Sequence, residues 1–439
     1  MSVRFNPGDI STEAAAQVQV ATIPRLPPVH IPRPRLVDAL LDARCRLRLI
    51  CAPAGFGKSV LMNECARLVP ADTHLVWLDL GGRPFTAEAL YSQLSRSLTG
   101  SSAPTADVQQ DLITLLNNFQ QPLWIMLDDY PRESTAQFDA CLDQLLERGP
   151  ESLSWWVSSR RQPAWKLPRL LLQGDLFELE AEALALTSGE LRQILKAHRL
   201  DLADDTFKQL LAGSEGWLAG VSLLLFNANE QAVRERLVAG TPLLRDYVQR
   251  EVLEGQSEDV RRALFALARM PRFSPQLCEH VLDGIGSGIV DVLKTFQLFI
   301  RQIDNCGEWF RLWRPLALML PRMPEAVSPT QTHVRACQWF ATRGEMREAV
   351  EHALWAGQPE VAANFLQRYG QEQLLIGDNV SHFLKWRSEL PQDLFNSTTR
   401  LIVLHGWALI ISARLDEVDD CLADLAKFFP QPDARRQAQ

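Results

Sequence analysis

The sequence contains no Cys-x-x-Cys pair, although it has eight cysteines. Closely spaced cysteine pairs mark zinc sites, and regularly spaced cysteines mark the disulfide frameworks of small secreted domains. Here the cysteines are scattered, and several, such as Cys51, lie inside apolar runs. We therefore predict reduced, buried thiols in a cytoplasmic protein.

Long hydrophobic runs are also lacking. The longest, around residues 401–413, is interrupted by His405 and Gly406 and falls short of the ~20 residues that cross a bilayer. Residues 1–22 have no apolar core behind a basic residue, so we expect a flexible tail there rather than a secretory signal. Both absences predict a protein without a membrane partner.

An excess of basic residues is missing as well, since the formal net charge is −8. This balance does not favour a large nucleic-acid-binding face, although it is compatible with a small basic module. The contents of 46% hydrophobic and 22% charged residues are ordinary for a globular protein. A chain of 439 residues exceeds a single core, so three or four domains are expected.

The most informative stretch that is present is LRLICAPAGFGKS, residues 47–59. Its first five residues predict a buried strand, and the glycine-containing loop that follows leads into a predicted helix. Strand, loop and helix in this order are the context of a phosphate-binding loop. Backbone N–H groups of such a loop surround phosphate oxygens. Lys58 would reach the β- and γ-phosphates, and the Ser59 hydroxyl would be a Mg²⁺ ligand.

The predicted nucleotide-binding loop departs from the usual motif at Ala52, where glycine is common. The predicted contacts from the loop and the start of its helix are Ala54, Gly55, Phe56, Gly57, Lys58, Ser59 and Val60. Arg33, in a proline-rich segment at 24–36, is a further predicted contact.

The third predicted strand, residues 122–129, carries Asp128 and Asp129 at its C-terminal end. Such a strand is expected downstream of a phosphate loop in the same sheet. Asp128 would hold Mg²⁺ through water, and Asp129 would orient or deprotonate the attacking water. The alternative is a solvated acidic turn, which fits poorly with the apolar residues that lead straight into the acids.

The next predicted strand, in residues 154–161, ends in two arginines. An arginine at this position can point into the crevice of the sheet and sense the γ-phosphate, and we favour Arg160 for that role. Two surface arginines in a turn remain an alternative.

The order of predicted elements indicates a multidomain chain. Apolar runs alternating with helical patterns predict an α/β nucleotide-binding domain with a parallel sheet. After it we expect a helical domain, a winged-helix domain with a hairpin formed by residues 296–303 and 309–312, and a tetratricopeptide-like solenoid. The predicted domain ranges are 23–182, 183–240, 241–325 and 326–439. The last domain has no obvious cap, which predicts that a longer protein has been cut here.

Several motifs together resemble the N-terminal half of the MalT-like, LuxR-type transcriptional regulators, which are signal-transducing ATPases with numerous domains (STAND). The matching stretches are 52–59 (APAGFGKS), 127–130 (LDDY), 158–160 (SSR) and 215–220 (EGWLAG). Two later stretches, 335–340 and 351–357, resemble the start of the family's helical repeat. The resemblance therefore runs from about residue 24 to the end of the sequence.

This resemblance implies a switch that holds ADP at rest and is released by ATP and an inducer, after which the protein forms a homo-oligomer and activates transcription. Slow Mg²⁺-dependent ATP hydrolysis would involve Asp128 and Asp129. The winged helix would act as a structural lock. The family's DNA-binding helix-turn-helix lies at the far C-terminus, and no candidate for it is found here. We therefore expect DNA contact only through a domain that this chain does not include.

Three positions depart from the family pattern. Leu218 replaces a proline that packs against adenine. Arg314 replaces a histidine that touches the β-phosphate in relatives; it could make that contact with a permanent charge, or be an ordinary surface residue. Pro131 replaces a histidine, and the effect of this change is open.

Two other functions compete with the switch. An interaction scaffold could keep the fold with a structural or vestigial nucleotide site, and a phosphotransferase could act on a small substrate. An inducer could bind the concave side of the solenoid, around Trp339, Trp355 and Trp386, although core packing explains these tryptophans equally well. The histidines show no ligand spacing and are expected to be surface or capping groups.

Overall fold

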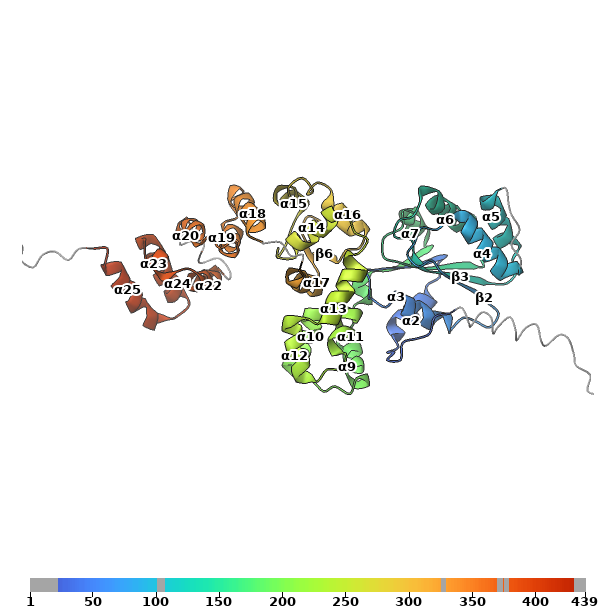
Figure 1. The fold of residues 1–439 in the computed structure, drawn as a ribbon, viewed down its shortest axis with the longest axis horizontal. Coiled ribbons are helices and arrows are strands. Elements are labelled where there is room, and N and C mark those ends of the chain that lie inside the picture. Colours follow the sequence, from blue (N-terminus) through green and yellow to red (C-terminus); the bar gives the residue numbers. More distant parts are fainter. Residues whose placement is uncertain (1–22, 101–106, 325–328, 369–373, 375–378, 430–439) are drawn as a thin grey trace, which may run out of the picture. The chain divides into compact units, whose positions relative to one another are not determined.

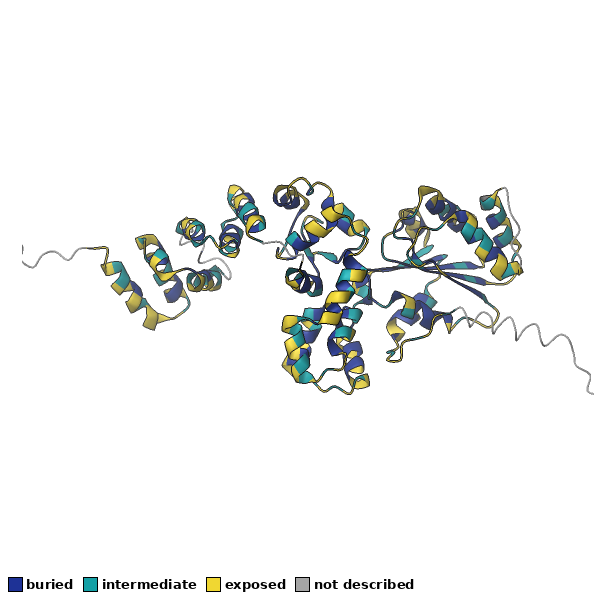
Figure 2. Ribbon diagram, viewed as in Figure 1, coloured by how far each residue is buried: buried dark blue, intermediate teal, exposed yellow. Residues whose placement is uncertain are grey.

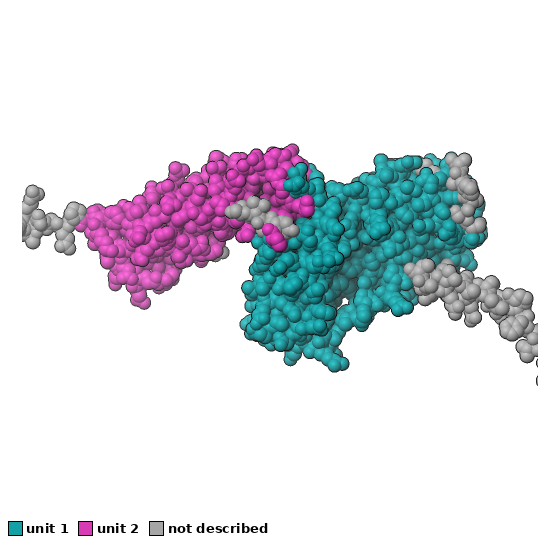
Figure 3. All heavy atoms as spheres, in the orientation of Figure 1, with its two compact units in different colours: residues 1–260, 291–301, 312–323 teal, residues 261–290, 302–311, 324–439 magenta. Residues whose placement is uncertain are grey.

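The computed structural model describes residues 23–100, 107–324, 329–368, 374 and 379–429. The chain divides into two compact units, coloured separately in Figure 3. Unit 1 comprises residues 1–260, 291–301 and 312–323, and unit 2 comprises residues 261–290, 302–311 and 324–439. The predicted tail at 1–22 lies outside the described residues.

Unit 1 contains a five-stranded sheet in the order β2-β3-β4-β1-β5, and every neighbouring pair is parallel. The strands are β1 (Leu47–Cys51), β2 (His74–Asp79), β3 (Leu123–Tyr130), β4 (Leu153–Ser159) and β5 (Leu176–Leu179). This confirms the predicted parallel α/β sheet. Because β4 lies between β1 and β3, its end separates the phosphate loop after β1 from the two aspartates of β3.

Helices cover both faces of this sheet, as Figure 1 shows. They are α2 (Pro34–Asp42) and α3 (Lys58–Ala66) on one face, and α4 (Ala87–Thr99), α5 (Val108–Asn118) and α6 (Ala136–Arg148) on the other. Burial on both sides explains why the strands are apolar almost throughout, and they are the darkest elements in Figure 2. Helix α7 (Leu167–Gln173) precedes the edge strand β5.

A buried arginine interrupts the apolar strand β1. Arg48 donates from Nε to the Leu40 carbonyl at 2.7 Å, and its guanidinium lies 4.6 Å from the centre of a Trp156 ring. Backbone carbonyls and an aromatic face therefore replace water around this charge.

A series of helices completes unit 1. They are α8 (Ala181–Leu184), α9 (Ser188–Ala197), α10 (Asp204–Ser214), α11 (Leu218–Leu225), α12 (Glu230–Ala239), α13 (Pro242–Tyr247), the π-helix η1 (Val248–Leu253), α17 (Arg314–Met319) and η2 (Leu320–Arg322). Helices α14 (Glu258–Leu267), α15 (Pro275–Val281) and α16 (Ile289–Thr295) follow η1 in sequence.

The predicted hairpin is present but shorter than expected. Its strands are β6 (Ile300–Gln302) and β7 (Phe310–Leu312), which form a two-stranded sheet. The extended backbone does not begin at residue 296, because Gln297 and Phe299 have φ angles of 48° and 57°. Left-handed backbone at two of the first four positions interrupts the regular geometry of a strand.

The last part of unit 2 consists of helices in pairs. They are α18 (Thr330–Thr342), α19 (Met346–Trp355), α20 (Pro359–Gln367), α22 (Asn379–Glu389), α23 (Gln392–Phe395), α24 (Thr399–Ile411), η3 (Leu415–Glu417) and α25 (Val418–Ala426). Ala336, Ala349, Ala353 and Ala362 are fully buried, as expected where small residues let helices approach closely. None of the helices in the described ranges has the length and apolarity needed to span a bilayer.

The prediction that the histidines are surface or capping groups is wrong for His333 and His352. Both side chains are buried, and their Nδ1 atoms lie 2.9 Å apart between helices α18 and α19. Burial lowers the pKa of His333 to about 4 and that of His352 to about 3. The rings of Phe340 and Trp355 lie against this pair, so the two imidazoles are neutral core groups near pH 7. Six of the eight cysteines are buried, as predicted, and none of the eight is paired with another.

A charged clamp joins the N-terminal segment of unit 1 to helix α9. The Nε atoms of Arg33 and Arg35 lie 3.2 and 3.0 Å from Glu190 Oε1. Glu190 also forms a capping box with Thr187 at the start of α9. Burial by itself would raise the pKa of Glu190, but hydrogen bonds from Arg35, the Thr187 backbone and Arg33 lower it to about 2.

Replacing Glu190 with glutamine should therefore destabilise unit 1 by about 3 kcal/mol near neutral pH. The folded carboxyl has a pKa below its ordinary value of 4.5, so its stabilising effect is complete above that value and is lost as the pH falls toward about 2. The wild type should lose roughly 1 kcal/mol of this advantage by about pH 4. Urea unfolding followed by circular dichroism measures both effects, with the exposed Glu180→Gln as the control. A difference between Glu190→Gln and wild type that is independent of pH would contradict the ionic origin.

Candidate functional site

The loop between β1 and α3 turns through two glycines in left-handed conformation, Gly55 with φ of 82° and Gly57 with φ of 80°. Residues with side chains rarely adopt this conformation, which explains the glycines. Helix α3 begins at Lys58, so the first-turn N–H groups of Lys58, Ser59 and Val60 lack acceptors within the helix. These groups and the positive end of the helix dipole suit a phosphate group.

The Lys58 side chain is buried within the phosphate loop. Its Nζ donates to the carbonyls of Ala52 at 2.8 Å and Pro53 at 2.9 Å. Burial, followed by the charge of Arg160, lowers the pKa of Lys58 to about 8. An anion beside the ammonium group would stabilise its charged form, so the site favours a negatively charged ligand.

The stretch 215–220 docks on the outer side of this loop. Trp217 donates from Nε1 to the Ala54 carbonyl at 2.9 Å, and the Ala219 N–H donates to the Gly55 carbonyl at 2.9 Å. A Cβ atom added to Gly55 would lie 2.5 Å from Ala219 Cβ, and one added to Gly57 would lie 2.9 Å from Leu218 Cδ2. Leu218, the residue that replaces proline, therefore packs against the loop backbone.

A cluster of aromatic side chains packs around Phe56 of the phosphate loop. Phe56 is fully buried and meets Trp313 edge-on, with ring centres 5.1 Å apart. Trp217 meets Phe299 in the same way at 5.2 Å, and the Trp313 N–H donates to the Phe299 carbonyl at 2.7 Å. Sequence reasoning missed Phe299 and Trp313. The only available signal was the position of Trp313 directly before Arg314.

The structure brings together the residues predicted to hold Mg²⁺. Ser59 Oγ and Ser158 Oγ donate to Asp128 Oδ1 at 2.9 and 2.5 Å. Asp128 is only 5% exposed; burial raises its pKa, while the hydrogen bonds from Ser158 and Ser59 oppose that rise. A hydroxyl and a carboxylate in contact fit a hard cation that also takes water and phosphate oxygens as ligands. Within the described ranges no three His, Cys, Asp or Glu side chains are placed to hold a metal on their own.

Asp129 lies at a distortion of β3, where the pairing with β4 shifts between Leu127 and Tyr130. Its φ is 50°, which is unusual for a residue with a side chain, and its N–H donates to Ser158 Oγ at 2.9 Å. The bulge turns Asp129 toward Arg160, whose Nε donates to Asp129 Oδ1 at 3.2 Å. The predicted base and the predicted γ-phosphate sensor therefore form an ion pair.

Arg160 has a second acidic partner that the sequence did not indicate. Its Nη1 donates to Glu251 Oε2 at 2.8 Å. Burial alone would lower the pKa of Arg160, but Asp129 and Glu251 raise it above its ordinary value. A small hollow between the phosphate loop and these charges is lined by Pro53, Ala54, Arg132, Arg160, Glu251 and Phe299, among others.

Arg33 and Arg314, the two remaining predicted nucleotide contacts, differ in exposure. Arg33 is buried in the Glu190 clamp, where Nη2 donates to the Leu184 carbonyl at 2.7 Å. Its Nη1 has no hydrogen-bond partner among the described residues. Arg314 is 62% exposed, and its backbone N–H donates to Glu215 Oε2 at 3.1 Å. Arg314 therefore lies beside the first residue of the stretch that docks on the loop.

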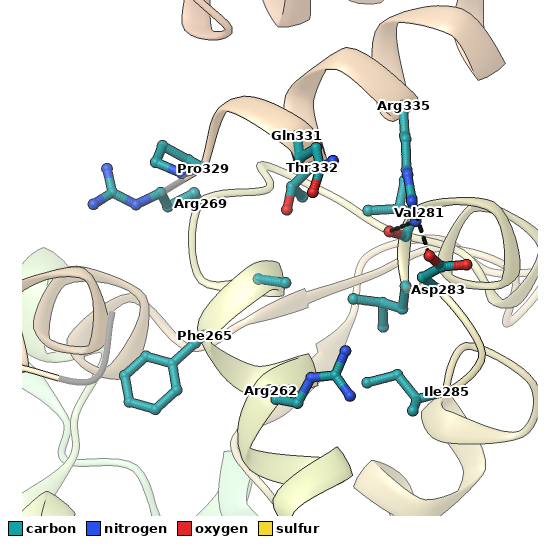
Figure 4. Close-up of a pocket in the computed structure, with 12 residues that line it drawn as sticks. Arg262, Phe265, Arg269, Val281, Asp283, Ile285, Pro329, Gln331, Thr332 and Arg335 are labelled. Carbon is teal, nitrogen blue, oxygen red and sulfur yellow. Dashed lines mark hydrogen bonds and ion pairs between the residues drawn. The ribbon is translucent and has the colours of Figure 1, made fainter. Parts of the chain in front are cut away.

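Unit 2 has a separate hollow of about 220 Å³, which Figure 4 shows. Arg262, Arg269 and Arg335 line it, and Arg335 donates to Asp283 at 3.0 Å. None of the predicted nucleotide contacts lies in it.

The three tryptophans considered for an inducer surface are not equally accessible. Trp386 is 1% exposed and Trp339 is 9% exposed, whereas Trp355 is 40% exposed. The first two are core residues, so only Trp355 could offer an aromatic surface to a ligand.

Comparison with known proteins confirms the predicted winged helix. Residues 249–331 match the family described as the MalT winged helix domain. This range contains helices α14 to α17 and the β6–β7 hairpin.

Curated relatives cover most of this chain. The serine/threonine-protein kinase PknK of Mycobacterium tuberculosis is 26% identical in an alignment 415 residues long, and the match covers 88% of this chain and 37% of that protein. The HTH-type transcriptional regulator MalT of Cronobacter sakazakii is 25% identical in an alignment 425 residues long, and the match covers 89% of this chain and 46% of that protein. The chain thus spans less than half the length of these relatives.

Among solved structures, the Walker-type ATPase PABY2304 of Pyrococcus abyssi aligns with a TM-score of 0.45 and 13% sequence identity. The alignment covers 67% of this chain and 96% of that protein.

Gly55→Ala should disrupt the docking of the loop. The added methyl group would meet Ala219 Cβ at 2.5 Å, Trp217 Nε1 at 2.7 Å and the Tyr247 hydroxyl at 2.8 Å. We expect a loss of at least about 2 kcal/mol in unfolding free energy. Gly81→Ala is the matched control, because Gly81 also has a positive φ but nothing within 4 Å, and it should cost about 1 kcal/mol. Equal losses in thermal or urea unfolding would show that backbone conformation alone requires the glycine.

Proposed function

We propose that this MalT-like chain is a nucleotide-controlled signal-transduction switch that regulates transcription. One observation carries the proposal. Lys58, Ser59, Asp128, Asp129 and Arg160 converge at one edge of the sheet, and the backbone of the same loop is held by the helical stretch 215–220. Nucleotide binding at this loop would therefore be coupled to the helical part of unit 1.

The kinds of relatives support a control function. A protein kinase and an HTH-type transcriptional regulator both match 88–89% of this chain. A segment common to two proteins with such different outputs fits a role in controlling output rather than producing it. We further propose that the protein is cytoplasmic and that its inducer, a small molecule or protein, binds the helical repeat. When activated, the protein would form a homo-oligomer. Contact with DNA would come from a part of the protein that is not in this chain.

In the proposed site, the ligand is ATP or ADP. Lys58 and the first-turn N–H groups of α3 would bind the β-phosphate, and Arg160 would bind the γ-phosphate. Mg²⁺ held near Ser59 and Asp128 would offset the charge of the phosphates. Asp129 would orient and deprotonate the attacking water, so hydrolysis would be slow as long as Arg160 remains bound to Asp129.

Two further arginines would complete the nucleotide contacts. The buried Nη1 of Arg33 has no partner within the described residues, and an acceptor on the base or ribose would satisfy it. The exposed Arg314 could reach the β-phosphate only if it turned away from Glu215, whose Oε1 lies 3.8 Å from its Nε.

The runner-up is an interaction scaffold with a structural or vestigial nucleotide site. Its support is that Lys58 donates to two carbonyls of the loop itself, so part of its hydrogen-bonding capacity is used within the protein. The departures from the family pattern at Ala52 and Leu218 also favour a scaffold.

Nucleotide released from the purified, denatured chain separates the switch from the scaffold. We expect about one ADP per chain in the wild type, and strongly reduced nucleotide in Lys58→Ala, because the buried ammonium group is the main positive charge inside the loop. Lys208→Ala, an exposed change on α10, is the control and should retain nucleotide. No released nucleotide, together with no binding of added Mg²⁺-ATP, would favour the scaffold.

Asp129→Asn should leave nucleotide binding within a few-fold of wild type and slow ATP hydrolysis at least ~100-fold, since the amide cannot accept a proton from water. Equilibrium binding and phosphate release measure the two effects separately. Asp205→Asn, an exposed change on α10, should alter neither. Equal turnover in wild type and Asp129→Asn would exclude Asp129 as the base.

A further inference from the structure

Glu251 occupies an unusual place in unit 1. It lies in the π-helix η1, directly after α13, and π-helical turns are rare and often occur at functional sites. Its carboxylate accepts a hydrogen bond from Arg160 Nη1 at 2.8 Å, and Arg132 Nη2 lies 3.9 Å from the same oxygen. Glu251 is thus bound to the arginine proposed to sense a third phosphate.

Asp129 and Glu251 accept hydrogen bonds from N–H groups of Arg160 with which it could bind a phosphate. Arg160 divides its guanidinium between Asp129, which accepts from Nε at 3.2 Å, and Glu251, which accepts from Nη1. The Arg160 side chain is 23% exposed and that of Glu251 is 38% exposed, so the pair is only partly shielded from water. A γ-phosphate that binds Arg160 therefore competes with two carboxylates for this guanidinium.

The segment that carries Glu251 also touches the phosphate loop. The Tyr247 hydroxyl lies 2.8 Å from the point where a Cβ of Gly55 would stand, and the Tyr247 ring meets Trp217 edge-on at 5.8 Å. Glu251 and Arg160 line the same hollow as Pro53 and Ala54 of the loop. Displacing Glu251 would therefore act on a segment in direct contact with the loop.

We propose that Glu251 sets the preference of the site between nucleoside diphosphate and triphosphate by occupying Arg160 in place of the third phosphate. This inference rests on the proposed function. A diphosphate would leave the Arg160–Glu251 pair intact, whereas the third phosphate of a triphosphate would compete with Glu251 for Arg160. A ligand shifts such an equilibrium by its difference in affinity for the two arrangements, and here that difference comes from the γ-phosphate alone.

The test measures the affinity of the full chain for Mg²⁺-ADP and for the non-hydrolysable Mg²⁺-β,γ-imido-ATP by isothermal titration calorimetry. Glu251→Gln removes the charge but keeps the shape of the side chain. We expect the triphosphate affinity to rise on the order of tenfold, because a charge-assisted hydrogen bond no longer opposes it. The ADP affinity should stay within about twofold. Glu254→Gln, an exposed change in the same segment, should alter neither affinity.

A double-mutant cycle with Arg160→Ala tests the route of the effect. Without Arg160, the Glu251 substitution should no longer change the ratio of the two affinities. An effect of Glu251→Gln that persists in the Arg160→Ala background, or that raises both affinities equally, would overturn the proposal. Glu251→Asp serves as a second variant if Glu251→Gln unfolds, since the shorter side chain keeps the charge but weakens the contact, and it should also raise triphosphate affinity.

The outcomes also separate the two proposals. If the wild type binds neither nucleotide, the proposed function fails, and the role of Glu251 fails with it. If the wild type binds both and the ratio is the same in Glu251→Gln, only the role of Glu251 is wrong.

Discussion

The hydrogen bond from the Trp217 indole to the Ala54 carbonyl is the contact on which the arrangement of the candidate site depends. A buried loop cannot leave its carbonyls unpaired without a substantial cost in free energy. Trp217 and the Ala219 N–H satisfy two of them, while Lys58 satisfies two more. With the carbonyls bound on one side, the loop keeps its turn, and the start of α3 can face a phosphate group. The glycines follow from this contact, because a side chain at Gly55 would occupy the space of Trp217 and Ala219.

Charge is balanced around this loop through a small number of shared partners. Asp128 is bound by two serines, and Asp129 shares Arg160 with Glu251. Each of these groups lies in a partly or fully buried position. A phosphate that binds here therefore competes with groups that are already paired, instead of binding an unpaired charge. A site built in this way responds to the number of negative charges on its ligand, which is the property a nucleotide-controlled switch needs.

Much of the nucleotide domain could be predicted from the sequence, because its signals are local. The strands read as continuous apolar runs, since both faces of a parallel sheet are covered. The phosphate loop and the aspartate pair follow their strands directly, and the end of β4 could be assigned in the same way. His333 and His352 were assigned wrongly because the ring contacts that exclude water from them come from Phe340 and Trp355, on the two helices that pair only in the fold.

The sequence by itself determined the succession of strands and helices along the nucleotide domain, the phosphate loop and the residue types that follow the strands, because each depends on neighbours within a few residues. Only the tertiary structure decided that Arg33 is clamped by Glu190, that Phe56 rests on Trp313, and that Arg160 is held by Glu251. These partners lie 157, 257 and 91 positions apart. No periodicity or motif indicates a pair separated by so many residues. Such a pair forms only when folding brings the two groups together and removes water from both of them.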